Sequence, residues 1–511
     1  MPLLIRLLTT ALWSLALLTF QSSEFIKPLT PKSPPVIEQK TDWSKEELSK
    51  PPNIIIVLSE AFWDITQMTN LKFSEDPAPF FHALQERYTH GTMLSPMFGG
   101  GTANVELEVL TGHSYRFFQE GSIVYEQYIK QPTASLATIL SSQGYKATAI
   151  SPFYNWYFNS SEVYKHLGFS KFISLEYFNP DEYVGPYIGD HAVAKRIIEE
   201  SEKNPGPDFI FANTMENHYH YWPGKFKRNT IDVSGTGSNE ALGIAETYAQ
   251  GMRGADDMLQ ELVTHFSQVK EPTVLVFFGD HLPSLEQYLV YKESKYITGE
   301  DDPDFLEKMH STPVIVWNNY LPPGQTDELH ISPSFLSPYI LHLAGRKGSA
   351  YTDYLSELSK KMPIVPPEDH YEAYHIDVDL VKEYEARQNA ILEAEKNNAL
   401  ASDPPFTLGY GDPVVKQITP EAVTVRGDTF GKAQLTLRGG RFGLGSTVFV
   451  NGQQLQSQWQ SEETLTVSLP KELYAKPGRL DVQVKTIDSK NHVLGQSQVL
   501  TVPVVEKTAA P

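Results

Sequence analysis

An aspartate and a histidine stand together directly after one of the most apolar runs of the chain. The segment reads TVLVFFGDHLP, and Asp280 and His281 follow the run. Carboxylate oxygen and imidazole nitrogen are ligands for ions such as Mn²⁺, Zn²⁺ or Mg²⁺. The same pair could also be a turn at a strand end in which the aspartate caps a helix. The pair by itself leaves metal binding and helix capping open.

Glu60 offers a second carboxylate at the end of a second apolar run, NIIIVLS. Taken alone, it could be an exposed carboxylate without a function. Two acidic strand ends at one sheet edge, however, repel each other unless a cation lies between them. We therefore expect Glu60, Asp280 and His281 to share one metal ion.

Thr102 follows three glycines and opens a helical pattern in MFGGGTANVELEVLTG. Threonine at a helix N-terminus is a common capping residue. The same place suits a nucleophile, because the helix dipole stabilises a developing negative charge and glycines let a phosphoryl group approach the backbone. The two roles are compatible, since a capping position is also an anion-binding position. We expect Thr102 to be the nucleophile and to lie beside the three metal ligands.

Two histidines follow another apolar run, in TMENHYHYW. A histidine at this place can donate to a phosphate oxygen or act as a general acid. Alternatively, both rings could simply pack among the neighbouring aromatic side chains. We favour a functional role for His218 and the packing role for His220.

The elements that must position these residues alternate between strands and helices. Apolar runs typical of buried parallel strands occupy residues 53–60, 146–151, 208–214, 273–280 and 312–319. Helical patterns lie between them at 134–144, 189–203 and 245–266. This alternation predicts an α/β domain with a mostly parallel sheet flanked by helices. In such folds the ligand crevice lies at the carboxyl ends of the strands, where Glu60 and Asp280 stand.

The pattern of apolar and polar residues changes in the last quarter of the chain. Residues 376–404 begin with a polar, charged helical pattern that we interpret as a helical linker. From 405 to 505, short alternating strands are separated by glycine, asparagine and proline turns, which predicts a small all-β sandwich. The spacing of its apolar residues and glycines resembles immunoglobulin-like IPT/TIG domains. We expect a catalytic domain at 51–375, this sandwich at 405–505 and a short tail at 506–511.

The N-terminus begins with an apolar stretch, LLIRLLTTALWSLALLTF, in which only Arg6 is charged. Its length suits a short membrane span or a signal peptide, and a buried core helix is a third interpretation. A proline- and lysine-rich stretch follows, and no A-x-A cleavage site is present. We expect an uncleaved membrane anchor at 1–22 and an extended linker at 23–50.

Composition excludes several classes of protein. The 511 residues are 41% hydrophobic, which is enough for a sizeable core. A net charge of −20 argues against a nucleic-acid binder, because such proteins carry a basic surface. The chain has no cysteine, which excludes disulfides, zinc–thiolate sites and thiol nucleophiles.

The four segments around these residues resemble, in the same order, the lipoteichoic acid synthase family of phosphoglycerol transferases in the alkaline-phosphatase/sulfatase superfamily. The resemblance covers about residues 51–350. The segment 159–172 also resembles a stretch of that family. The resemblance implies the following roles: metal ligands Glu60, Thr102, Asp280 and His281; the nucleophile Thr102, within a motif that Gly100 and Glu106 complete; and the substrate-contacting pair Asn217 and His218.

This chain departs from the family pattern where the family holds the glycerol-phosphate headgroup. Ser160 stands in place of an arginine, and Ser151 and Phe153 replace a histidine and an aspartate. The aromatic side chains nearby, Tyr154 and Trp156 above all, suit stacking or a cation–π contact.

Two interpretations of this departure remain open. The headgroup could differ from glycerol phosphate and be ethanolamine phosphate or a sugar-linked phosphate. Alternatively, another basic residue could reach the pocket and leave the substrate unchanged; the candidates are Lys146, Lys165 and Arg253.

The resemblance implies a transferase that moves a phosphoglycerol-type headgroup from a phospholipid to an alcohol or glycan acceptor through a phosphothreonine. Its expected cofactor is a divalent metal, Mn²⁺ first, with Mg²⁺ and Zn²⁺ as alternatives. Its expected location is the cell membrane, with the catalytic domain outside the cytoplasm. The alternatives are a phosphoethanolamine transferase, a phosphodiesterase or sulfatase-like hydrolase on the same scaffold, and a non-catalytic cell-surface protein. We expect no nucleic-acid partner, and the C-terminal domain could bind an envelope polymer or a protein.

Overall fold

The computed structural model describes residues 43–321, 326–397, 405–426 and 432–506. The predicted anchor and residues 23–42 of the predicted linker lie outside this part of the chain. Residues 43–50 lie within it and include helix α2 (Lys45–Leu48), which Ser44 caps. Within the described ranges, no helix has both the length and the apolar character needed to cross a bilayer.

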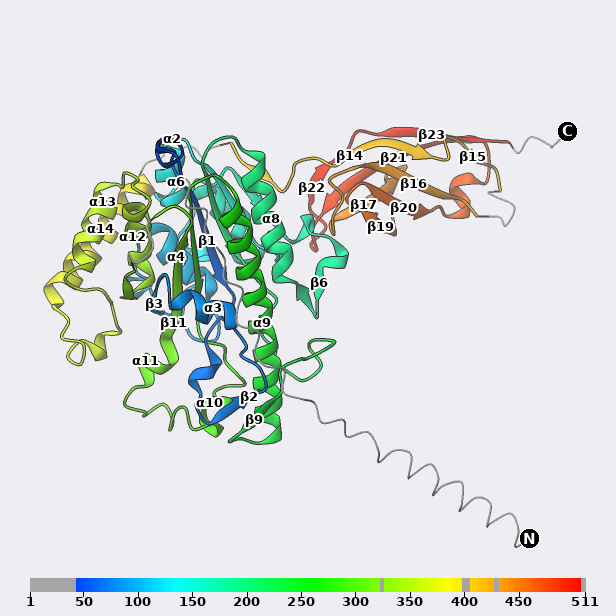
Figure 1. Ribbon diagram of the computed structural model, residues 1–511. Coiled ribbons are helices and arrows are strands. Elements are labelled where there is room, and N and C mark those ends of the chain that lie inside the picture. Colours follow the sequence, from blue (N-terminus) through cyan, green and yellow to red (C-terminus); the bar gives the residue numbers. More distant parts are fainter. Residues whose placement is uncertain (1–42, 322–325, 398–404, 427–431, 507–511) are drawn as a thin grey trace, which may run out of the picture. The chain divides into compact units, whose positions relative to one another are not determined.

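A sheet of nine strands, counted over the described residues, forms the centre of the α/β domain (Figure 1). Neighbouring strands are parallel except where β11 pairs with β10 and β3. The strand order is β12 (Glu328–Ile331), β3 (Thr89–Leu94), β11 (Ser311–Asn318), β10 (Thr273–Gly279), β1 (Asn53–Ser59), β8 (Asp208–Asn213), β4 (Lys146–Ile150), β5 (Lys171–Ile173) and β13 (Thr407–Leu408). The prediction of a mostly parallel sheet is therefore confirmed.

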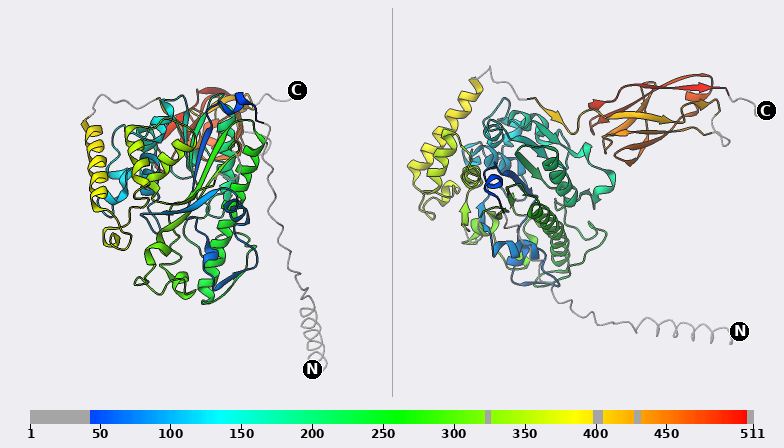
Figure 2. Two further views of the ribbon diagram at one scale, coloured as in Figure 1. Left: turned by 60° about the vertical axis from the view of Figure 1, so that its left-hand side comes forward. Right: turned by 45° about the horizontal axis from the view of Figure 1, so that its top comes forward.

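Helices cover both faces of this sheet (Figure 2). Strand β1 is buried along its whole length, because Ile55 and Val57 join the core on one face and Ile54 and Ile56 join the core on the other. The first core includes α3 (Pro79–Gln85), α8 (Asp190–Lys203) and α9 (Asn239–Gln268). The second includes α4 (Thr102–Thr111), α6 (Leu136–Ser141), α12 (Leu336–Leu343), α13 (Ala350–Ser359) and α14 (Val378–Asn397). Burial on both faces explains why the sheet strands read as continuous apolar runs.

Helix α14 occupies the segment that the sequence suggests as a charged linker. Most of its polar residues face solvent, but Tyr384 is fully buried and donates a hydrogen bond to the carbonyl oxygen of Gly112 at 2.6 Å. Gln388 is also buried and bonds the backbone of Ser114. The helix is thus packed against the α/β domain along one side.

The C-terminal domain is an all-β sandwich with a core of its own. One sheet contains β14 (Val414–Thr419), β16 (Gln434–Gly440), β20 (Thr464–Ser468) and β19 (Ser457–Ser461). The other contains β15 (Val423–Thr424), β23 (Leu500–Val505), β21 (Gly478–Ile487), β17 (Ser446–Val450), β18 (Gln453–Leu455) and β22 (Val493–Gln496). Alternate side chains of β16 and β21 point inward, as two-layer packing requires. The predicted immunoglobulin-like sandwich is confirmed.

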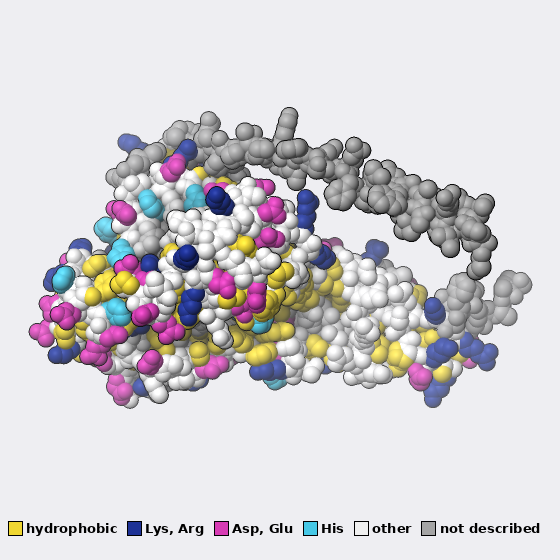
Figure 3. All heavy atoms as spheres, turned by 90° about the horizontal axis from the view of Figure 1, so that it is seen from below, with side chains coloured by type: hydrophobic (Ala, Val, Ile, Leu, Met, Phe, Trp, Pro, Cys, Tyr) yellow, Lys and Arg dark blue, Asp and Glu magenta, His cyan; other side chains and the backbone are white. Residues whose placement is uncertain are grey.

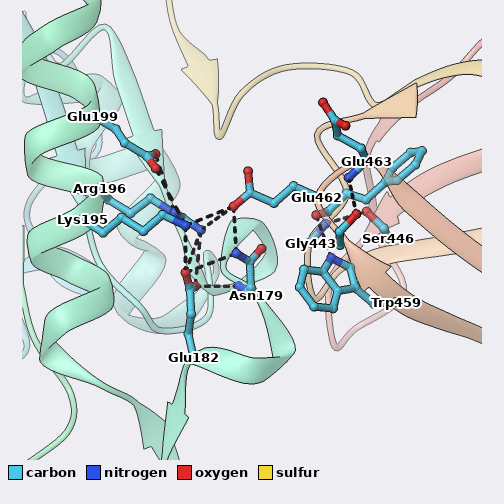
Figure 4. A network of polar contacts seen from close by, with 12 residues as sticks. Asn179, Glu182, Lys195, Arg196, Glu199, Gly443, Ser446, Trp459, Glu462 and Glu463 are labelled. Atoms are coloured by element: carbon cyan, nitrogen blue, oxygen red, sulfur yellow. Dashed lines mark hydrogen bonds and ion pairs between the residues drawn. The ribbon is translucent and has the colours of Figure 1, made fainter. Parts of the chain in front are cut away.

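Polar contacts join the two domains through a network around Arg196 (Figure 4). The Arg196 guanidinium lies 3.3 Å from Glu182 and 3.7 Å from Glu462 of the sandwich. Asn179 donates a hydrogen bond of 2.8 Å to the same Glu462 carboxylate, and Lys195 lies 3.4 Å from it. Because the Glu462 side chain is half exposed, its ion pairs contribute at most about 1 kcal/mol each.

We expect limited proteolysis to cut the chain between residues 395 and 412 and to leave two folded fragments. The physical reason is that the sandwich core shares no buried apolar cluster with the α/β domain. Mass spectrometry of the fragments and a separate thermal transition for each would check this. A chain that resists cleavage there and unfolds in one cooperative transition would contradict it.

On the face drawn in Figure 3, acidic and basic side chains of the described residues are interspersed over the α/β domain.

Candidate active site

Glu60, Asp280 and His281 come together at the carboxyl edge of the sheet. One ligand atom of each residue lies within 4.8 Å of the others, and all three side chains are buried. The cause is the register of the parallel pair β1–β10, in which Ser59 stands opposite Gly279. The residues that follow these two strand ends therefore emerge side by side.

Gly279 makes this close approach possible. A Cβ at this position would overlap the carbonyl oxygen of Phe62, because the loop after β1 crosses directly over the end of β10. The same loop donates a hydrogen bond from the Ala61 N–H to Asp280 Oδ1 at 2.8 Å. Glycine is thus required here by space.

Thr102 is the first residue of α4, and its hydroxyl reaches the same place. The hydroxyl oxygen lies 3.4 Å from Glu60 Oε2, toward which it donates. Gly99, Gly100 and Gly101 all have positive φ, which bends the chain sharply before the helix. The Gly99 N–H donates to the carbonyl oxygen of Leu282 at 3.0 Å and ties this turn to the loop after β10. The structure thus brings the four sequence-predicted metal ligands together.

The free atoms of these side chains fit a divalent cation. Asp280 Oδ2 and His281 Nε2 are buried, lie 3.2 Å apart, and have no hydrogen-bond partner. His281 Nδ1 lies 3.0 Å from the carbonyl oxygen of Leu282, so Nδ1 carries the proton and Nε2 offers a lone pair. Two acceptors that face each other in a dry site need a cation between them.

The electrostatics of Glu60 point the same way. Burial, together with repulsion from the Asp280 carboxylate, raises the pKa of Glu60 to about 8. A divalent ion between the two carboxylates would reverse this effect and keep both ionised. The donor set of two carboxylates, a hydroxyl and an imidazole therefore suits Mn²⁺, Mg²⁺ or Zn²⁺.

A cavity of about 450 Å³ opens over Glu60, Thr102 and His281. Its other lining residues include the aromatic Phe153, Tyr154, Tyr157, Tyr219 and Tyr221, the polar Ser151, Ser160, Ser284 and Gln287, and His218. Among the described residues that line it, there is no lysine or arginine. The cavity is thus an aromatic pocket with the ligand cluster at its base.

The three basic residues suggested as replacements for the missing arginine have other partners. Lys146 lies 3.7 Å from Glu200, and Lys165 lies 3.5 Å from Glu162. Arg253 donates to the carbonyl oxygens of residues 76 and 77. None of the three lines the cavity.

His218 lines the cavity and is held by its backbone neighbours. Its Nδ1 lies 3.0 Å from the carbonyl oxygen of Tyr219, which fixes the proton on Nδ1. The hydroxyl of Tyr187 lies 3.2 Å from the same nitrogen and donates to the same carbonyl oxygen. Burial lowers the pKa of His218 below its ordinary value. The ring thus keeps Nε2 for a group in the cavity.

Three residues named from the sequence lie outside the cavity lining. Asn217 is buried against Gly251 of α9. Trp156 turns toward the sandwich domain, where its indole N–H donates to Ser489 Oγ at 3.0 Å. His220 is exposed, and its ring lies against Tyr219. Tyr154, which the sequence also suggests as a pocket residue, does line the cavity.

Nothing in the sequence singles out Lys225, which binds the backbone of the loop that contains His218. Its ammonium group donates to the carbonyl oxygen of His218 at 2.6 Å. Burial lowers the pKa of Lys225 to about 8, while the nearby carboxylates of Glu216, Glu60 and Asp190 act in the opposite direction. These partners come from separate elements, so only the folded chain shows them together.

Glu106 completes the glycine–threonine motif but binds within the protein. Its carboxylate accepts hydrogen bonds from the hydroxyls of Tyr125 and Tyr164 and from the Asn213 amide at the end of β8. Burial raises the pKa of Glu106 to about 7. The side chain therefore fixes α4, and with it Thr102, against the sheet edge.

Comparison with known proteins gives matches for both domains. The sulfatase family model matches residues 52–346, and the IPT/TIG domain model matches residues 413–500. A putative cyclic beta-1,2-glucan modification protein of Rhizobium meliloti (strain 1021) is 38% identical over 312 residues, which are 60% of this chain and 48% of that protein. A lipoteichoic acid synthase of Staphylococcus saprophyticus is 26% identical over 338 residues, 63% of this chain and 50% of that enzyme.

A solved structure shares the fold. The Streptococcus pyogenes phosphoglycerol transferase GacH, in complex with sn-glycerol-1-phosphate, superposes with a TM-score of 0.54 at 24% identity, over 70% of this chain and 98% of that chain. The chain spans about half the length of the two curated relatives named above. The sulfatase match, however, covers more than half of the chain and includes every residue of the ligand cluster. This protein therefore belongs to the sulfatase family and carries an IPT/TIG domain after its catalytic domain.

Proposed function

We propose that this protein is a metal-dependent phosphotransferase that moves a phosphoglycerol-type headgroup from a phospholipid to an alcohol of a glycan. The observation that carries the proposal is the position of Thr102, whose hydroxyl stands at a helix N-terminus 3.4 Å from the metal-ligand cluster. A nucleophile at this place forms a covalent phosphothreonine, which a second alcohol can then attack. The sulfatase-family membership and the names of the relatives support this assignment.

Glu60, Thr102, Asp280 and His281 would hold the metal, for which Mn²⁺ is our first candidate. A bound divalent ion supplies positive charge that favours the ionised threonine oxygen and the phosphoryl oxygens. The first N–H groups of α4 add a preorganised partial positive charge at the same point.

In the first half-reaction, the Thr102 oxygen attacks phosphorus, and the bond from phosphorus to the diacylglycerol oxygen breaks. His218, through its unprotonated Nε2, is placed to take the proton of the Thr102 hydroxyl and to pass it to that leaving oxygen. In the second half-reaction, an acceptor hydroxyl loses its proton to the same nitrogen and attacks phosphorus. The bond to Thr102 then breaks, Nε2 returns the proton to the Thr102 oxygen, and the enzyme is back in its starting state.

We propose a glycan as the acceptor and the outer side of the cell membrane as the place of reaction. The relative with the highest identity named above is described as a cyclic beta-1,2-glucan modification protein, so this glucan is the first acceptor to test. A phospholipid donor lies in a membrane, and the apolar N-terminal stretch would keep the enzyme close to it.

One observation favours a second candidate, phosphoethanolamine transfer. Tyr154, Tyr157 and Tyr219 line the cavity, and no lysine or arginine does so among the described residues. Tyrosine rings attract an ammonium group through a cation–π contact of about 0.5–2 kcal/mol. A glycerol headgroup gains nothing comparable from these rings.

We expect phosphatidylglycerol to be the better donor in a panel of purified phospholipids that also contains phosphatidylethanolamine and a sugar phospholipid. Each donor is incubated with Mn²⁺, with and without cyclic beta-1,2-glucan, and the products are identified by mass spectrometry. Headgroup transfer to the glucan supports a transferase, whereas release of free headgroup in both conditions would show a hydrolase. Turnover of phosphatidylethanolamine alone would replace the first candidate by the second.

A further inference from the structure

A second cavity, of about 280 Å³, lies where the α/β domain meets the IPT/TIG domain. The catalytic domain contributes Tyr154, Leu175, Glu176 and Tyr183, and the IPT/TIG domain contributes Leu444, Gly445, Thr447, Ile487, Asp488 and Ser489. Tyr154 also lines the catalytic cavity. One side chain thus borders both cavities.

Hydrogen bonds between the domains hold the walls of this second cavity. The Gly445 N–H donates to the carbonyl oxygen of Glu176 at 2.9 Å, and the Leu444 N–H donates to that of Phe178 at 2.8 Å. A Cβ at Gly445 would lie 2.9 Å from the Glu176 side chain, so the two chains touch closely here. The two domains are therefore joined at this cavity by backbone contacts that do not depend on long flexible side chains.

The border residue Tyr154 is held by a stack that both domains build. Its ring lies parallel to that of Trp156, with centroids 5.3 Å apart and an angle of 14° between the planes. The ammonium group of Lys490 stands 3.7 Å from the centroid of the Trp156 ring, and the Trp156 N–H donates to Ser489. The IPT/TIG domain therefore positions a residue of the catalytic cavity.

The chemistry of the second cavity suits a neutral polyhydroxyl group. The Glu176 carboxylate accepts from Ser174 and Asn155, and the Asp488 carboxylate accepts from the backbone N–H of His492. Both acids lie in the lining, and no lysine or arginine does so among the described residues. An anionic phosphate would be repelled there.

An aromatic ring and hydroxyl groups complete the lining. Tyr183 is 42% exposed and lines the cavity, so a ligand can reach it. A sugar presents an apolar C–H face that packs on such a ring, and its hydroxyls can bond Thr447, Ser489 and the two carboxylates.

We propose that this second cavity is the subsite that binds a sugar residue of a neutral glycan acceptor. The chain of the glycan would pass Tyr154, so that one of its hydroxyls reaches the catalytic cavity. The IPT/TIG domain is then part of the acceptor site. This inference rests on the proposed transferase function, but glycan binding can be measured without any turnover.

The test uses the full-length protein and two substitutions in the second cavity. Thr447→Trp fills the space, and Tyr183→Ala removes the ring. Val499→Trp, at a residue of the same domain that is 52% exposed and does not line the cavity, is the matched control. Affinity for cyclic beta-1,2-glucan is measured by calorimetry, and donor cleavage by water is measured in the absence of glucan.

We expect both cavity substitutions to weaken glucan binding at least tenfold, while the control binds as the unsubstituted protein does. Donor cleavage without glucan should stay unchanged in all three variants. Equal glucan affinity in the two cavity variants and the control would overturn the inference. It would also be overturned if the cavity variants kept their affinity for glucan but lost binding of sn-glycerol-1-phosphate, measured in the same way. Absence of donor cleavage in the unsubstituted protein would instead count against the proposed function alone.

Discussion

Replacement of Thr102 by alanine is expected to lower both headgroup transfer and donor hydrolysis by about 1000-fold or more, equivalent to about 4 kcal/mol of lost transition-state stabilisation. The reason is that Thr102 alone, among the described residues that line the cavity, places a hydroxyl at the start of α4 and beside the ligand cluster. Folding should be unaffected, because Thr102 makes no capping hydrogen bond and alanine favours helix formation. The rates of transfer and hydrolysis are measured under single-turnover conditions with the best donor of the phospholipid panel.

Two variants and one direct observation accompany this result. Thr102→Ser should retain substantial activity, since it keeps the hydroxyl. Thr111→Ala, at the other end of the same helix, is the matched control and should keep the activity of the unsubstituted protein. Donor without acceptor should leave a headgroup phosphate on the peptide that contains Thr102, detectable by mass spectrometry. An alanine variant that still forms this adduct at full rate would contradict the assignment.

Asp280→Asn is expected to weaken Mn²⁺ binding at least 100-fold, equivalent to about 3 kcal/mol of binding free energy, and to abolish headgroup transfer. Binding is measured by calorimetry after removal of metal by a chelator. The substitution keeps the oxygen that accepts from the Ala61 N–H but removes the negative charge opposite Glu60.

The same substitution should have an opposite effect on metal-free stability. Without a cation, Asp280 repels the buried Glu60 carboxylate, so the neutral asparagine should make the metal-free variant at least as stable as the metal-free unsubstituted protein. Thermal unfolding with and without Mn²⁺ checks this, and exposed Asp301→Asn is the control. Equal Mn²⁺ stabilisation of Asp280→Asn and the unsubstituted protein would show that the ion binds elsewhere.

Sequence patterns predicted the parts of the site that depend on single strands and their ends. The apolar runs that become β1 and β10 are long and uninterrupted, so the positions of Glu60 and Asp280 just beyond them could be predicted. Thr102 could be placed at a helix start because three glycines and an apolar pattern flank it. The antiparallel direction of β11 could not be predicted, since its apolar run looks the same in either direction.

Contacts between distant segments could not be predicted from local pattern. Trp156 was expected in the substrate pocket, but its partners Ser489 and Lys490 lie more than 300 residues further along the chain. Lys225 likewise gains its role only from the fold, because the carboxylates around it come from other elements. Such positions are set by packing and by charge pairs across the structure, which hydrophobic spacing does not encode.

The short strand β13 has a consequence for any attempt to separate the two domains. It pairs with β5, whose other side is already taken by β4, and it is the last strand at that end of the sheet. An α/β fragment that ends before Thr407 would leave the backbone groups of β5 without their ladder partner. Open strand edges recruit other chains, so such a fragment would be prone to aggregate or to pair edge to edge. A soluble catalytic fragment should therefore extend through Gly411, beyond the point where the sequence alone would end it.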